Sequence, residues 1–134
     1  MKSIGLALAV ILLGTMARGE ETKSEPSRAV TVKGQVVCSA CWGEADRTKV
    51  AYGTKDDLEC AKTCAASGVK AALAVGEKGR VELYTLEDGT FPRKGTGWLS
   101  YIAKTVEITG RVTGAAGSRH IKVDSLRSLP EGAR

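Results

Sequence analysis

Two stretches of the chain alternate apolar and polar residues with the period of two that is typical of a half-buried strand. The first begins at Ala29 and has valine or glycine at positions 30, 32, 34 and 36. The second has apolar residues or glycine at positions 106, 108, 110 and 112. The mid-strand glycines, Gly34 and Gly110, permit the strong bend that a strand needs to curl around a small barrel. The pattern therefore predicts closure into a barrel.

Between these two strands the sequence predicts a helix. Thr54 can cap free N–H groups at its start, acidic residues follow in the first turn, and Gly68 is a suitable ending. With 3.6 residues per turn, one face of this helix is expected to be buried. That face holds Leu58, Cys60, Ala61, Cys64 and Ala65.

The rest of the pattern adds three strands and a short helix. Residues 71–75 and 80–86 are expected to form a hairpin across the turn-rich residues 76–79. Residues 98–103 have the spacing of one or two helical turns, and a last strand is expected around Ile121 and Val123. The prediction is a mainly β, five-stranded, OB-like barrel. It has a cysteine-bearing helical insertion between strands 1 and 2 and a short helix between strands 3 and 4.

The ends of the chain are expected to lie outside the barrel. Residues 1–17 combine Lys2, a short apolar run and small residues at 15 and 17, which predicts a secretory signal peptide cleaved near Ala17. The alternative is an N-terminal membrane anchor, although the run is short for a stable one. Residues 18–28 are expected to be a disordered leader, 29–128 one OB-like domain and 129–134 a tail. The protein is therefore expected to be exported, to a periplasm or out of the cell.

Charge and motifs argue against several functions. The formal net charge is +5, with both signs interspersed along the chain, so no anionic partner is singled out. The aromatic residues are spread singly and export removes the usual targets, so nucleic-acid binding is not expected. The chain lacks hydrolase, nucleotide-loop and paired-carboxylate motifs, and His120, its one histidine, is expected to be solvated. No enzyme activity is predicted.

The candidate site is a cluster of all four cysteines. Cys38 and Cys41 come near the end of the first strand, and Cys60 and Cys64 lie one turn apart on the helix. Four thiolates in two pairs suit one tetrahedral zinc ion or a soft ion such as Cu(I). The prediction is therefore a non-catalytic zinc or copper site formed by Cys38, Cys41, Cys60 and Cys64, with Trp42 beside it.

Two other interpretations stay open. Export favours disulfides, and the useful ones would join Cys38 and Cys41 to Cys60 and Cys64. The protein would then be a stapled binding module whose barrel face or loop at 91–97 engages a protein or glycan. A redox-active Cys38–Cys41 pair is less favoured, because the pair follows a strand and not a helix N-terminus. The sequence makes no prediction of the oligomeric state.

Several short motifs also suggest a family. The first strand reads Val32-x-Gly34-x-Val36-Val37, and the helix reads Cys60-Ala61-Lys62-Thr63-Cys64 before Gly68. With the hairpin and the Gly110 strand, most of residues 30–126 resembles small exported bacterial OB-fold proteins of unassigned function. In those relatives an acid often stands at the position of Cys38, and a histidine shortly precedes the first helical cysteine, where this chain has Asp57-Leu58-Glu59. The resemblance thus implies a metal ligand, more than a disulfide partner, at position 38.

Overall fold

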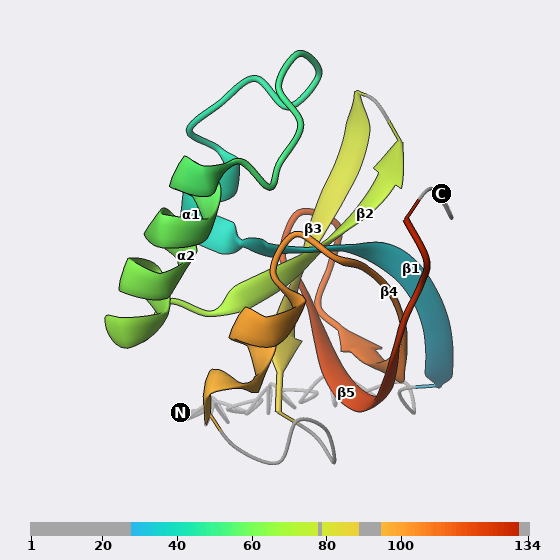
Figure 1. Ribbon diagram of the computed structural model, residues 1–134. Helices are drawn as coiled ribbons and strands as arrows, with labels where there is room; N and C mark the ends of the chain where they lie inside the picture. Colours follow the sequence, from blue (N-terminus) through green and yellow to red (C-terminus); the bar gives the residue numbers. More distant parts are fainter. Residues whose placement is uncertain (1–27, 78, 89–94, 132–134) are drawn as a thin grey trace, which may run out of the picture.

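The computed structural model describes residues 28–77, 79–88 and 95–131 of the chain (Figure 1). Five strands close into a barrel in the order β1-β2-β3-β5-β4, which confirms the predicted five-stranded barrel of a mainly β protein. The expected signal peptide, nearly all of the leader and the end of the tail lie outside the described residues. The strands are β1 (Ala29–Cys38), β2 (Ala71–Glu77), β3 (Arg80–Glu87), β4 (Thr105–Thr113) and β5 (Arg119–Ser128).

Strand β1 lies between β4 and β2 in the closed barrel. Its first part pairs antiparallel with β4, and its last part pairs antiparallel with β2. Gln35 takes part in both pairings, opposite Thr105 on one side and Ala74 on the other. A parallel pairing of β3 with β5 closes the sheet. The end of β1 therefore leaves the barrel in a direction that is fixed by two neighbouring strands.

The mid-strand glycines lie where backbones approach closely. A Cβ atom at Gly34 would collide with the carbonyl oxygen of Ala74, and one at Gly110 would collide with that of Lys122. The pairing of β4 with β5 also shifts register between Thr109 and Gly110, as at a β-bulge. Glycine is therefore required at both bends, in agreement with their expected role.

The core is filled by aliphatic side chains of the strands, and consecutive residues are buried at the end of β1 and the start of β2. The largest fully buried side chains are Val36, Val37, Leu73, Val106, Ile108, Ile121 and Val123. Burial of this apolar surface is the main favourable contribution to folding of a small domain. The cysteine-bearing segments extend this core at one end of the barrel, where Cys38, Cys41 and Ala61 are also buried.

The helical segments gather on one side of the barrel (Figure 1). They are the single turn α1 (Ser39–Trp42), the helix α2 (Lys55–Ala66) and the 3-10 helix η1 (Gly95–Tyr101). Helix α2 lies against β1, α1 and η1. The turn α1 was not predicted: four residues are too few to show a helical period. Among the described residues, no helix is long and apolar enough to cross a membrane.

The buried face of α2 differs from the predicted one. Ala61 is buried and both cysteines are half-buried, but Leu58 is 37% exposed, so its predicted burial was wrong. Asp57 is buried instead. The cause is that the carboxylate of Asp57 is bound by a network of donors at the start of the helix, described below, which turns the neighbouring Leu58 toward solvent.

The close approach at Gly110 predicts that Gly110→Ala destabilises the barrel by about 1–3 kcal/mol, because the new methyl group must displace backbone in a packed interior. The free energy of unfolding, measured with urea, checks this. Gly43→Ala is the matched control, since a Cβ atom there meets nothing within 4 Å. An equal effect of the two substitutions would contradict the close approach.

Candidate metal centre

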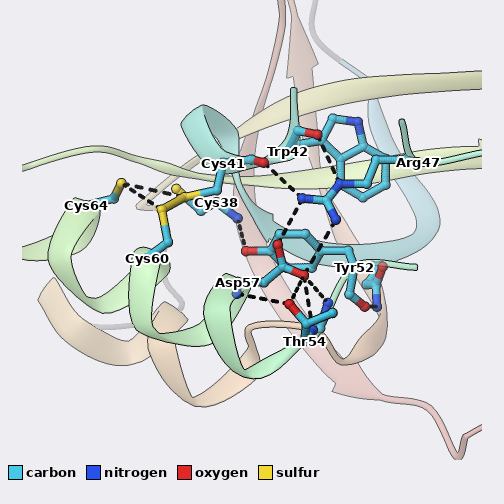
Figure 2. A network of polar contacts seen from close by, with 11 residues as sticks. Cys38, Cys41, Trp42, Arg47, Tyr52, Thr54, Asp57, Cys60 and Cys64 are labelled. Atoms are coloured by element: carbon cyan, nitrogen blue, oxygen red, sulfur yellow. Dashed lines mark hydrogen bonds and ion pairs between the residues drawn. A yellow bond between two sulfur atoms is a disulfide. The ribbon is translucent and has the colours of Figure 1, made fainter. Parts of the chain in front are cut away.

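The four cysteines come from three consecutive elements that meet at one end of the barrel. Cys38 is the last residue of β1 and the N-cap of α1, and Cys41 lies within α1. Cys60 and Cys64 lie one turn apart on α2, so both side chains project toward the same neighbour. Figure 2 shows the four sulfur atoms together between α1 and α2. The predicted convergence of the two pairs is therefore observed.

Two of the four sulfur atoms are bonded to each other. Cys41 and Cys60 form a disulfide with an S–S distance of 2.17 Å, whereas Cys38 and Cys64 are free thiols. This bond is one of the cross-pairings that the disulfide interpretation predicted. The second cross-pairing is not formed. Cys38 and Cys41 are not bonded to each other either, whereas the redox-pair interpretation would require a bond between them.

The free thiol of Cys64 lies close to both sulfur atoms of the disulfide. Its Sγ is 3.7 Å from that of Cys41 and 3.9 Å from that of Cys60. Because these distances are nearly equal, Cys64 lies beside the S–S bond and not at its end. A thiolate that attacks a disulfide sulfur approaches in line with the S–S bond that breaks. Cys64 is therefore not aligned for thiol–disulfide exchange with this bond.

Cys38 completes the group. The Sγ atoms of Cys38, Cys41 and Cys64 all lie within 4.8 Å of one another, and no other group of three or more His, Cys, Asp or Glu ligand atoms is found in the described part of the chain. Soft thiolates are the ligands that zinc and copper(I) prefer. These three cysteines could therefore hold such an ion if the disulfide of Cys41 were reduced.

A buried ion pair fixes the loop that joins α1 to α2. The guanidinium of Arg47 donates to Asp57 at 2.9 Å, and both side chains are only 10% exposed. Arg47 also donates to the backbone carbonyls of Cys41 at 2.9 Å and Trp42 at 3.0 Å. One side chain thus ties the turn that carries Cys41 to the helix that carries Cys60 and Cys64.

The other oxygen of Asp57 caps the helix. Asp57 Oδ2 accepts bonds from the backbone N–H groups of Gly53 and Thr54, and Thr54 in turn accepts from the Asp57 N–H. This reciprocal arrangement is a capping box. Burial raises the pKa of Asp57, but the bonds from Gly53, Arg47 and Thr54 outweigh it and lower the pKa from 3.8 to about 2. The carboxylate is therefore charged at neutral pH.

Two aromatic rings surround Arg47. The guanidinium carbon is 5.7 Å from the ring centre of Trp42 and 5.0 Å from that of Tyr52, within the range of a cation–π contact. Tyr52 reaches the cysteine cluster, since its hydroxyl oxygen accepts a bond from the N–H of Cys38. The side chain of Trp42, which was predicted to lie beside the cluster, faces Arg47 and Tyr52 instead (Figure 2).

The thiol of Cys64 is held in its protonated form. A hydrogen bond with Cys38, followed by burial, raises the pKa of Cys64 above its ordinary value. A metal ion that binds Cys64 must therefore displace a proton. Binding is expected to weaken as the pH falls.

His120 belongs to a different part of the molecule. It lies on β5, and its Nδ1 is 3.0 Å from a carboxylate oxygen of Glu87 on β3. It is not one of the candidate metal ligands. Of the loop at 91–97, residues 91–94 lie outside the described part of the chain.

Comparison with protein-family models, with curated proteins and with solved structures gives no match to this chain. No site or role is therefore transferred from a relative. The candidate metal centre depends on the positions of the four sulfur atoms and on the network that holds them.

The buried position of Asp57 predicts that Asp57→Asn destabilises the protein by about 3 kcal/mol, because Arg47 is left buried without its charge partner. Urea unfolding at pH 7 measures this. Glu59→Gln is the matched control on the same helix: the side chain of Glu59 is 62% exposed and pairs with an exposed lysine, and such pairs contribute little.

The same measurement at lower pH tests the pKa of Asp57. Since its folded pKa lies below its ordinary value, the stability it contributes is present above about pH 3.8 and is lost as the pH falls toward 2. This part of the acid destabilisation should be missing in Asp57→Asn. An acid profile that the substitution leaves unchanged would show that Asp57 is not held as described.

Proposed function

We propose that this protein is an exported, non-catalytic barrel protein that binds one soft metal ion, zinc or copper, through the reduced thiols of Cys38, Cys41, Cys60 and Cys64. The ion links the end of β1 to α2. In this role the barrel supplies a rigid support, and the metal centre is the functional part of the molecule.

The observation that carries the proposal is the position of Cys64. In a tetrahedral zinc centre with bonds of about 2.3 Å, neighbouring sulfur atoms are about 3.8 Å apart. Cys64 lies 3.7 and 3.9 Å from the sulfur atoms of Cys41 and Cys60, and Cys38 lies in the same group. Two edges of the required tetrahedron thus have the right length already.

The disulfide decides when this centre can form. Reduction of Cys41–Cys60 by two electrons gives two thiols, whose sulfur atoms must then separate to the edge length of a tetrahedron. Both sulfur atoms move by rotation about χ1 of a short side chain. Four thiolates then become available within one small volume.

The topology supports an OB-like assignment. The order β1-β2-β3-β5-β4, with β3 parallel to β5, fits a five-stranded Greek-key barrel of this kind. The proposal of export rests on the apolar and small residues of positions 1–17. A disulfide between Cys41 and Cys60 suits an oxidising compartment.

A second candidate function is a disulfide-stapled binding module for a protein or glycan. The Cys41–Cys60 bond favours it, as does a groove of about 850 Å³ between the loop after α1 and the β2–β3 hairpin. Trp42, Tyr52, Lys33 and Lys49 are among the residues that line this groove. In this alternative the free thiols of Cys38 and Cys64 have no assigned task, which is why metal binding is preferred.

The proposed function predicts that the protein, once its thiols are reduced and the reductant is removed, binds one zinc ion. Native mass spectrometry under anaerobic conditions should show a single zinc adduct with the loss of protons from the thiols. Cys64→Ser should weaken binding strongly, because one of four ligands is lost. Thr63→Ala, a change at an exposed neighbour on the same helix, is the matched control and should bind as the parent does.

Zinc binding that Cys64→Ser leaves unchanged would overturn the four-cysteine centre. A reduced protein that takes up neither zinc nor copper(I) would leave the stapled binding module as the better account.

A further inference from the structure

With the Cys41–Cys60 disulfide intact, two thiols of the cluster remain, those of Cys38 and Cys64. We propose that these two thiols form a second kind of metal site, which takes a monovalent soft cation such as Cu(I) or Ag(I) and excludes zinc. The proposal rests on the proposed function, because it assigns a further site to the disulfide state of the same cluster.

The two sulfur atoms are close enough for two-coordinate binding of one ion. Soft monovalent d¹⁰ ions such as Cu(I) and Ag(I) accept two thiolates on opposite sides of the ion. With metal–sulfur bonds of about 2.3 Å, comparable to those of zinc, the two sulfur atoms lie about 4.6 Å apart. The Sγ atoms of Cys38 and Cys64 are no more than 4.8 Å apart, so both can reach one ion after side-chain rotation.

Zinc is excluded because further ligands are missing. Zinc in proteins takes at least three protein ligands, and four in structural sites. In the disulfide form Cys41 and Cys60 are bonded to each other, and among the described residues no histidine or carboxylate joins the group that contains Cys38 and Cys64. Two thiolates are too few for zinc but are enough for a monovalent soft ion.

The surroundings of Cys38 also suit such an ion. Cys38 is 3% exposed, and it lines a cavity of about 320 Å³ together with Ala61, Ala65 and Lys70. The alanine side chains leave room beside the thiol. Two thiolates and one monovalent cation carry a single negative charge, which costs less to bury than the two of a four-thiolate zinc centre.

The binding step involves no electron transfer. One monovalent ion replaces the two thiol protons of Cys38 and Cys64, two metal–sulfur bonds form, and two protons go to solvent. The Cys41–Cys60 bond is unchanged. The redox state of that pair would therefore decide whether zinc can bind: the disulfide form takes only a monovalent soft ion, whereas the dithiol form can take zinc.

Native mass spectrometry of the disulfide form tests this, with silver(I) as the probe because it needs no reductant. The expected result is one silver ion for each chain, with the loss of two protons and with the disulfide still present, and no adduct when zinc is offered. Cys64→Ser should lose the silver adduct. Thr63→Ala should keep it. Cys64 is only half-buried, so Cys64→Ser is expected to fold. It therefore remains informative even if Cys38→Ser fails to fold.

Silver binding that survives Cys64→Ser, silver uptake only with loss of the disulfide, or zinc binding by the disulfide form would each overturn the inference. Zinc binding by the reduced protein tests the proposed function separately. Zinc bound by the reduced form without silver bound by the disulfide form would leave the four-cysteine centre in place and remove only the second site.

Discussion

The ion pair between Arg47 and Asp57 is the interaction on which the cysteine cluster depends. Cys41 lies on α1 and Cys60 and Cys64 lie on α2, and these elements are joined by a loop with little regular structure. Arg47 closes that loop by binding the carboxylate of Asp57 and the carbonyl of Cys41 at the same time. A buried pair of this kind is costly to break on one side only, so the separation of the two cysteine-bearing turns is narrowly defined.

The barrel positions the remaining cysteine, Cys38. Because β1 is paired with β4 over its first part and with β2 over its last part, the position of Cys38 is set by the sheet. The bond from the Cys38 N–H to Tyr52 then connects the end of β1 to the loop that carries Arg47. Sheet, loop and helix each place one part of the cluster, and the four sulfur atoms meet where they join.

The sequence was sufficient to predict the strands and the cysteine pairs, because both depend on local spacing. The period of two, the glycines at 34 and 110 and the one-turn separation of Cys60 and Cys64 are visible without any tertiary information. The predicted burial of Leu58 was wrong because the prediction used only helical spacing and side-chain polarity. Neither property shows that Asp57 has a buried partner. The motif from Thr54 to Asp57 does signal a capping box. Arg47, however, lies in a polar loop without periodicity and gives no such signal.

Whether a sulfur–sulfur bond forms is also not a property of spacing. The same four positions allow a four-thiolate centre or a disulfide with two free thiols, and the choice depends on electrons supplied from outside the chain. This links the two metal sites that are proposed: the zinc centre requires all four sulfur atoms near one point, and the second site requires only those of Cys38 and Cys64. The ion pair and the barrel would keep the sulfur atoms together in either state.

X-ray absorption of the reduced, zinc-loaded protein tests this convergence most directly, because it counts the atoms bound to the metal and measures their distances. Four sulfur ligands at about 2.3 Å are the result expected for a centre built from all four cysteines. A zinc ion bound by two or fewer sulfur atoms, with nitrogen or oxygen completing the shell, would contradict it.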